Sequence, residues 1–409
     1  MRVLLVCGDA RPWLDGVADY VTRLAAHLPA YDVEPLIGAV GEVAPHAYRL
    51  APRWTLGGTV VAGRAIRRLR PAILHVQFAP SAFRFDGSVG LLPLVLGRAV
   101  PLVTTVHEYG WWTWLPHVPA PAYERLQRRG WWDRETGLLV PRSRRVLVTN
   151  PAARDALHRR FAGRVEPVQI PIGPNVEPAG LDRAPAGKQA REQAREDVRR
   201  HLGLPPDATL LVFFGFVHPV KGVRYLVDAL ARLRRDRRDL HLVVAGGFES
   251  LALPGPQARA FESELRDHVA AAGMDAHVTI TGFRPAAEVS RLLSASDVAV
   301  LPFTAGVTTK SGALLAVLAH GLPTVVTRPP VGDPELVDGG SCVLVDRVRD
   351  ADALVTALRR VLDDPGLRAC VAAGGRALAD RHGWAAIAAR HAQVYREVLR
   401  EVAREVADG

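Results

Sequence analysis

The sequence has few cysteines and no long apolar run. Its three cysteines, Cys7, Cys342 and Cys370, lie far apart in 409 residues. This argues against a disulfide framework or a thiolate zinc site and indicates a reducing compartment. The most apolar stretch, 91–106, is interrupted by two prolines and an arginine, whereas a membrane-spanning helix needs about 20 mostly apolar residues. We expect no transmembrane helix.

The composition is that of an ordinary globular protein. Hydrophobic residues make up 48% of the chain and charged residues 23%, which excludes a disordered or collagen-like chain. A secretory signal is not expected, because the first apolar run, Val3–Cys7, ends directly in Gly8 and Asp9. The expected location is the cytoplasm, and a peripheral contact with a membrane stays open.

Lysine is almost absent, although the chain is basic. Lys and Arg total 52 against 42 Asp and Glu, a formal net charge of +10, and all but three of these cations are arginine. The arginines are interleaved with acidic residues, and no basic-aromatic motif accompanies them. We therefore interpret arginine as the default surface cation and expect no nucleic-acid partner. The lysines are Lys188, Lys221 and Lys310.

Several motifs of known chemistry are also missing. The sequence has no G-x-G-x-x-G or G-x-x-x-x-G-K-[ST] phosphate loop, no H-E-x-x-H and no G-x-S-x-G. Asp350 and Asp352 could suggest a metal-nucleotide site, but they stand at the expected start of a helix, where aspartate caps free amides. We expect neither a metal nor a resident cofactor.

What the sequence does contain is a repeated alternation of short apolar runs and longer amphipathic stretches. The runs are continuous, which predicts strands buried on both faces, hence parallel sheets covered by helices. The pattern occurs twice, with about six strands each time, and so predicts an α/β protein with two Rossmann-like, doubly wound domains. The expected strands are Val3–Cys7, Glu34–Val40, Ile73–Phe78, Leu102–Val106, Arg145–Thr149, Val168–Ile172, Leu210–Phe214, Leu240–Ala245, Val278–Thr281, Val298–Phe303, Thr324–Thr327 and Cys342–Val345.

The order of these elements predicts four segments. The N-terminal Rossmann-like domain covers 1–176, a charged linker that runs into a polar helix covers 177–200, and the C-terminal Rossmann-like domain covers 201–380. An amphipathic segment, 381–409, follows and is expected to pack back on the first domain. Ligands of open parallel sheets bind beyond the carboxyl ends of the strands, so two facing domains predict a central cleft.

Two segments of the second domain suggest a diphosphate site. Lys221 follows the strand Leu210–Phe214 after a turn that contains Gly215, and a compact ammonium suits a phosphate. The second segment follows the strand Val298–Phe303 and combines hydroxyls, a lysine and the start of a helix. The alternatives are a solvated lysine in the first case and simple helix capping in the second. The residues of the second segment are Thr308, Thr309, Lys310, Ser311 and Gly312.

In the first domain, polar residues follow two strands. His107 and Glu108 stand at the carboxyl end of Leu102–Val106, and Asp15 and Gly16 lie between the first strand and the first helix. A glycine there permits close approach to a ligand, and strand-end histidines often face a cleft; a structural role for His107 is the alternative.

Five of the eight tryptophans lie in the segment 111–132. They predict either a packed subdomain or a platform for a sugar, lipid or apolar acceptor, and the sequence leaves both open. On the second interpretation, Trp111 and Trp112 belong to the acceptor side.

The order of these motifs resembles the GT-B glycosyltransferases, and within them the retaining, nucleotide-sugar-dependent family four. The likeness covers nearly the whole chain. It implies that the first domain binds the acceptor and the second the donor, that His107 contacts the sugar, and that Lys221 stabilises the leaving diphosphate. The segments that carry it are Gly16–Ala18, Thr105–His107, Gly215–Gly222, Gly282–Phe283, Ala295–Pro302, Leu315–Pro323, Gly332–Val337 and Trp384–Tyr395.

The chain departs from this family at three positions. The family's paired glutamates, one near the donor sugar and one on the ribose, correspond to Thr308 and Ala316, and its arginine beside the phosphates corresponds to Phe216. Lys310, with Thr309, is expected to replace the arginine. The ribose contact has no visible replacement, and Glu335 is the first candidate.

These observations predict a glycosyltransferase that moves a sugar from a nucleotide-diphosphate-sugar to an acceptor, with retention and without a metal. The predicted partners are the nucleotide sugar and a small-molecule, glycan or lipid-linked acceptor. The alternatives are a nucleotide-sugar 2-epimerase on the same fold and a non-catalytic nucleotide-sugar-binding protein.

Overall fold

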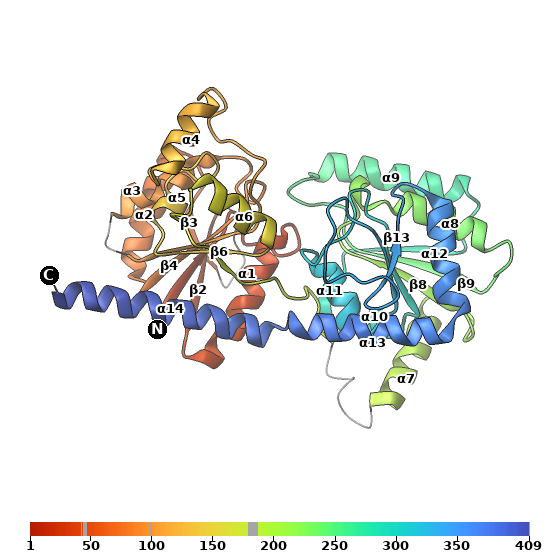
Figure 1. Ribbon diagram of the computed structural model, residues 1–409. Coiled ribbons are helices and arrows are strands. Elements are labelled where there is room, and N and C mark those ends of the chain that lie inside the picture. Colours follow the sequence, from red (N-terminus) through yellow and green to blue (C-terminus); the bar gives the residue numbers. More distant parts are fainter. Residues whose placement is uncertain (42, 44–46, 98–99, 179–186, 409) are drawn as a thin grey trace. The chain divides into compact units, whose positions relative to one another are not determined.

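Two parallel sheets, each covered by helices, organise the chain (Figure 1). This computed structural model describes residues 1–41, 43, 47–97, 100–178 and 187–408. Unit 1 comprises Met1–Ile172 and Trp384–Gly409, and unit 2 comprises Gly173–Gly383. Each unit has its own hydrophobic core. The predicted pair of α/β domains is therefore confirmed.

Unit 1 contains a seven-stranded parallel sheet in the order β3-β2-β1-β4-β5-β6-β7, which reverses direction between β1 and β4. Its strands are β1 (Arg2–Val6), β2 (Glu34–Val40), β3 (Ala47–Ala51), β4 (Ile73–Phe78), β5 (Leu102–Val106), β6 (Arg145–Val148) and β7 (Val168–Gln169). Its helices are α1 (Gly16–His27), η1 (Leu28–Tyr31), α2 (Leu56–Leu69), η2 (Gly87–Leu91), α3 (Leu92–Leu96), α4 (Ala120–Arg128), α5 (Leu139–Arg142), α6 (Pro151–Arg160) and α14 (Trp384–Asp408).

Unit 2 contains a six-stranded parallel sheet in the order β10-β9-β8-β11-β12-β13, which reverses between β8 and β11. Its strands are β8 (Thr209–Phe214), β9 (Leu240–Ala245), β10 (Val278–Gly282), β11 (Val298–Leu301), β12 (Thr324–Thr327) and β13 (Val343–Val345). Its helices are α7 (Gly187–His201), η3 (Pro219–Lys221), α8 (Val223–Leu233), α9 (Gly255–Ala271), α10 (Ala286–Ala295), α11 (Gly312–Ala319), α12 (Ala351–Asp363) and α13 (Pro365–Arg381).

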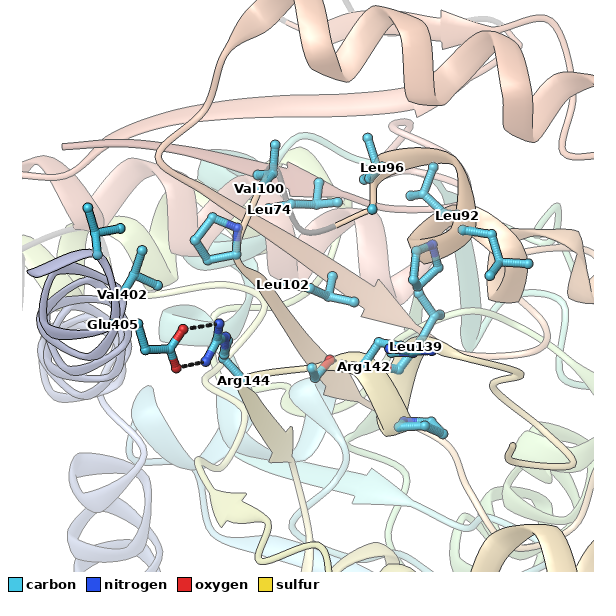
Figure 2. Close-up of a pocket in the computed structure, with 17 residues that line it drawn as sticks. Leu74, Leu92, Leu96, Val100, Leu102, Leu139, Arg142, Arg144, Val402 and Glu405 are labelled. Atoms are coloured by element: carbon cyan, nitrogen blue, oxygen red, sulfur yellow. Dashed lines mark hydrogen bonds and ion pairs between the residues drawn. The ribbon is translucent and has the colours of Figure 1, made fainter. Parts of the chain in front are cut away.

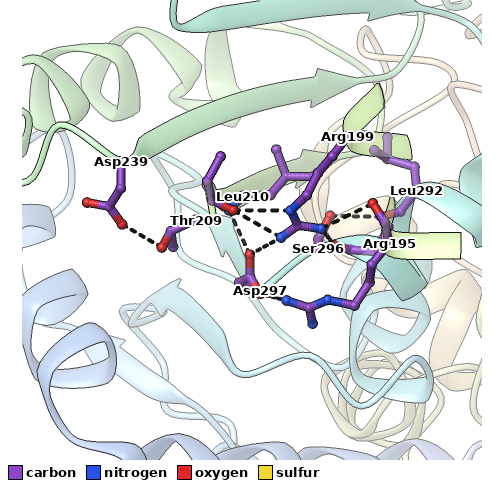
Figure 3. Close-up of polar contacts among 10 residues, drawn as sticks. Arg195, Arg199, Thr209, Leu210, Asp239, Leu292, Ser296 and Asp297 are labelled. Atoms are coloured by element: carbon purple, nitrogen blue, oxygen red, sulfur yellow. Dashed lines mark hydrogen bonds and ion pairs between the residues drawn. The ribbon is translucent and has the colours of Figure 1, made fainter. Parts of the chain in front are cut away.

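The helix α7 (Gly187–His201) lies in the second half of the segment 177–200, where a linker that runs into a polar helix is expected. It packs within unit 2 against α10, and the unit begins at Gly173. The buried guanidinium of Arg199 donates to Asp297 Oδ2 at 2.7 Å and to the carbonyl oxygens of Ala208 and Ala295. Asp297 also accepts from Arg195 and from the amide of Leu210 on β8 (Figure 3). These bonds fasten the polar helix to the amino ends of the strands.

The last helix, α14, completes the core of unit 1, as predicted for a helix that returns to the first domain. Its apolar and aromatic side chains recur at intervals of three and four residues, which places them on one face. That face contacts α1 and η1. Its buried residues are Trp384, Ile387, Ala388, His391, Ala392, Val394, Tyr395 and Val398.

Candidate functional site

The predicted donor residues of unit 2 follow the two strands between which the strand order reverses. Lys221 follows β8, and the segment 304–312 follows the neighbouring strand β11. The two loops are joined directly, because the amide of Thr304 donates to the carbonyl oxygen of Val220 at 2.9 Å. In doubly wound sheets this point of reversal, at the carboxyl ends of the strands, is where ligands bind.

Lys221 lies on an aromatic ring. Its Nζ is 3.7 Å from the centroid of Phe303, and loss of hydration lowers the pKa of its ammonium to about 8. Within the described part of the chain, no carboxylate forms an ion pair with it. At neutral pH it is therefore a poorly hydrated cation without a counter-charge.

Two glycines shape the loop that carries Lys221. Gly222 has φ +69°, and a Cβ there would lie 2.0 Å from the carbonyl oxygen of Pro302. Gly215 has φ +130°, and its Cβ would lie 3.3 Å from the Cβ of Ala313 at the start of α11. The close packing of β8, β11 and α11 thus requires these residues.

The segment 308–312 is held by a residue that the sequence analysis did not select. Asp333 Oδ2 accepts from both the amide and the hydroxyl of Thr309, at 2.8 and 2.9 Å. Ser311 caps α11, since its hydroxyl accepts from the amide of Leu314 at 3.2 Å. The donors of Thr309 are therefore engaged by Asp333, which follows β12, and the capping interpretation holds for Ser311.

Lys310 and Gly312 occupy the outer part of this segment. Lys310 is exposed, and its amide lies 3.4 Å from the hydroxyl oxygen of Thr308. Gly312 is the first residue of α11, and its carbonyl oxygen accepts from the amide of Asn175 at 3.3 Å. Asn175 Oδ1 is buried beside it without a hydrogen-bond partner among the described residues.

Ala316 and Glu335 lie in different surroundings. Ala316 is fully buried in the core of unit 2. The carboxylate of Glu335 lies 3.2 Å from His382 Nε2 and 3.5 Å from the guanidinium of Arg381, at the end of α13. Both partners hold Glu335 toward α13, and its predicted ribose contact stays a prediction.

In unit 1, His107 extends the line of β5. Its Nε2 lies 2.9 Å from Gln77 Oε1 on the neighbouring strand β4, and its ring meets that of Tyr20 edge to face, with centroids 4.8 Å apart. Burial, and then the nearby His391, lower the pKa of His107 to about 3. His107 is therefore neutral at physiological pH, and its donor bond to Gln77 leaves Nδ1 able to accept a hydrogen bond.

Asp15 follows β1, Glu108 follows β5, and the two carboxylates lie near each other. Asp15 caps α1 by accepting from the amide of Ala18 at 3.2 Å. Burial raises the pKa of Asp15 to about 6, and the neighbouring Asp9 and Glu108 contribute to the increase. Gly16 is exposed, and a Cβ there would meet no atom within 4 Å.

The tryptophan segment divides into an interior and an exposed part. Trp114 stacks on Trp132 with centroids 5.7 Å apart and fills the space where a Cβ on Gly87 would lie. Trp111, by contrast, is 60% exposed and meets Phe85, itself 53% exposed, edge to face. Trp112 is half-buried and also faces Phe85. The structure therefore contains both a packed subdomain and an exposed aromatic surface.

A groove of about 880 Å³ lies at the other end of the unit 1 sheet, away from these residues (Figure 2). Leu74 and Leu102, near the amino ends of β4 and β5, line it together with Val402 of α14. Arg144 and Glu405 form an ion pair across its edge. Most of its other lining residues belong to α3 and to the segment 139–144, so the groove lies among α3, α5 and α14 at this end of the sheet.

The described residues contain no group of three or more His, Cys, Asp or Glu side chains arranged to hold a metal ion. Every helix described is too short or too polar to cross a bilayer.

Comparison with known proteins gives consistent matches. Residues 208–364 match the family model of glycosyl transferases group 1. The chain is 26% identical to the alpha-D-kanosaminyltransferase of Streptomyces kanamyceticus, over 86% of this chain and 84% of that protein. It is 30% identical to the D-inositol 3-phosphate glycosyltransferase of Salinispora arenicola, over 79% and 69% of the two chains. Other D-inositol 3-phosphate glycosyltransferases match over about half of their own length.

Solved structures show the same fold. Anabaena HepE, crystallised with UDP and glucose, superposes with a TM-score of 0.70 at 17% identity, covering 97% of this chain and 100% of that one. At this identity the likeness concerns the fold, which is that of two parallel-sheet α/β domains.

Proposed function

The chain belongs to the glycosyl transferases group 1 family, and on this premise we propose that unit 2 binds a nucleotide-diphosphate-sugar while unit 1 binds the acceptor. The observation that carries the proposal is the half-buried ammonium of Lys221, which lacks a carboxylate partner among the described residues. A poorly hydrated cation is stabilised by a bound anion, and its place after β8 is where a doubly wound sheet binds ligands.

In the proposed reaction, the bond between the sugar and the diphosphate breaks, and its electrons leave with the diphosphate. Lys221 and Lys310 then stabilise the growing negative charge, together with the positive end of the α11 dipole. Neutral His107 accepts a hydrogen bond from a sugar hydroxyl through Nδ1 and so orients the ring. The proposal includes hexosyl transfer with retention and without a metal.

The acceptor side of the proposal rests on unit 1. Glu108 accepts from the hydroxyl of Ser81 at 3.3 Å, and Asp15 lies close to it. These carboxylates can receive acceptor hydroxyls, and the exposed face of Trp111 can stack on an apolar ring face.

Product analysis tests this function. The protein is incubated with nucleoside-diphosphate sugars, with and without candidate acceptors, and the products are identified by mass spectrometry and NMR. We expect a product only when both substrates are present, an unchanged anomeric configuration, and activity that persists in EDTA. Epimerised sugar from the donor alone would indicate the 2-epimerase instead, and binding without turnover would indicate a non-catalytic protein.

A further inference from the structure

A cluster of polar side chains lies in the core of unit 1 behind His107. It contains three residues of the sheet and α1, together with two residues of α14, and all five are at most 5% exposed. The rest of the buried face of α14 is mainly apolar. The members of this cluster are His75, Gln77, Tyr20, His391 and Tyr395.

One series of contacts runs from α14 through β4 to His107. The hydroxyl of Tyr395 lies 2.7 Å from His75 Nδ1, and His75 Nε2 lies 2.7 Å from the hydroxyl of Thr105. The amide nitrogen of Gln77 lies against the His75 ring, 3.1 Å from Nε2 and 3.2 Å from Nδ1, and Gln77 Oε1 lies toward His107. Because an amide oxygen only accepts, His107 Nε2 carries the proton.

A second series runs through α1. His391 Nδ1 lies 2.8 Å from the carbonyl oxygen of Ile387, which can only accept, so His391 Nε2 is an acceptor. The hydroxyl of Tyr20 donates to that nitrogen at 3.3 Å, and the ring of Tyr20 packs edge to face on His107. The two series together determine the direction of the His107 ring and which of its nitrogens is protonated.

We propose that Tyr395 and His391 are positioning residues, by which the last helix holds His107 with Nε2 protonated and Nδ1 facing the sugar. The inference rests on the proposed role of His107. Apolar residues of similar size would fill this core without the cost of burying polar groups, so mere packing of α14 does not account for the cluster. The link explains why α14 supplies a tyrosine that contacts His75 of β4 and a histidine that contacts Tyr20 of α1.

The test compares two tyrosine variants that each lose one hydroxyl contact between α14 and another element of unit 1. Tyr395→Phe removes the contact to His75. Tyr31→Phe is the matched control. The hydroxyl of Tyr31, on η1, donates to the carbonyl oxygen of Ala385 on α14 but has no contact with the cluster. Both are compared by thermal midpoint, by kcat and KM, and by ¹⁵N NMR of the histidine rings in the full-length protein.

We expect Tyr395→Phe to lower kcat about tenfold or more with little change in donor KM, and to shift the NMR signal of His107 toward a mixture of tautomers. Tyr31→Phe should change neither. Equal kcat values and an unchanged His107 signal in both variants would overturn the positioning role. His107→Ala is measured in parallel, since full activity in that variant would contradict the proposed role of His107 itself, whereas the NMR result tests the link independently.

Discussion

At the scale of single residues, the chemistry of unit 2 depends on how little water surrounds Lys221. The ring of Phe303 lies beneath its ammonium and offers the negative face of its π system, which partly replaces hydration. An arginine would spread its charge over a planar group and form bidentate bonds, whereas lysine brings a point charge close to a phosphate. Thr309 is neutral and its donors are bound to Asp333, so it adds no positive charge to the site. The positive side chains of the site are its two lysines, Lys221 and Lys310.

The lowered pKa of Lys221 predicts a pH dependence. Below pH 8 the ammonium is protonated and attracts the diphosphate, and above pH 8 it loses its charge, so kcat/KM for the donor should fall about tenfold per pH unit. Lys221→Arg stays charged and should show no such decrease up to pH 10, whatever its absolute activity. A profile of wild type that is flat from pH 7 to 10 would contradict this.

The resemblance places the buried Ala316 where a ribose-binding glutamate is expected, and this predicts loose recognition of the nucleoside. Loss of a charged acceptor for hydroxyls costs about 1.5–3 kcal/mol. Ribonucleoside and 2′-deoxyribonucleoside diphosphates should therefore compete within about tenfold of each other. A strong preference for ribose that disappears in Glu335→Gln would show that Glu335 leaves Arg381 and His382 to make the contact.

At the scale of elements, the sequence predicts most strands because they are apolar on both faces. β2, β4 and β5 match their predicted bounds at both ends. β3 was not predicted, since it is an edge strand in which Tyr48 and Arg49 are exposed.

The site was only partly predictable. The rarity of lysine singled out Lys221 and Lys310, but Asp333 and Gln77 act on partners 24 and 30 residues away that only folding brings near. His75 and Gln77, two polar residues two apart in a buried strand, were an available signal.

The fastening of α7 predicts a marked effect on stability. Arg199→Ala removes a buried guanidinium and its bonds to Asp297 and two carbonyl oxygens, which should lower the free energy of unfolding by about 3 kcal/mol. The neighbouring Arg200 forms an exposed pair with Asp197, so Arg200→Ala should change it by less than about 0.5 kcal/mol. Urea unfolding followed by circular dichroism measures both, and equal values would contradict the assignment.

At the scale of the whole molecule, two separate cores share one chain that enters unit 2 at Gly173 and returns to unit 1 at Trp384. All eight tryptophans belong to unit 1. Tryptophan fluorescence therefore reports the unfolding of unit 1, whereas far-ultraviolet circular dichroism reports both units.

This distribution predicts which signal responds to ligand. A nucleoside diphosphate that binds unit 2 stabilises that unit by mass action. Its addition should raise the midpoint seen by circular dichroism more than the midpoint seen by fluorescence. A larger shift of the fluorescence midpoint would place the nucleotide on unit 1 and contradict the proposed division of roles.

The binding of a nucleoside diphosphate to Lys221 variants tests the central claim most directly. Isothermal titration calorimetry compares Lys221→Ala with the control Arg224→Ala. Arg224 is an exposed cation three residues further along the chain, and among the described carboxylates it pairs only with Glu264, at 3.5 Å. The account predicts that Lys221→Ala loses about 2–4 kcal/mol, or about 30- to 700-fold in affinity, while Arg224→Ala binds like wild type. Equal affinities of the two variants would contradict it.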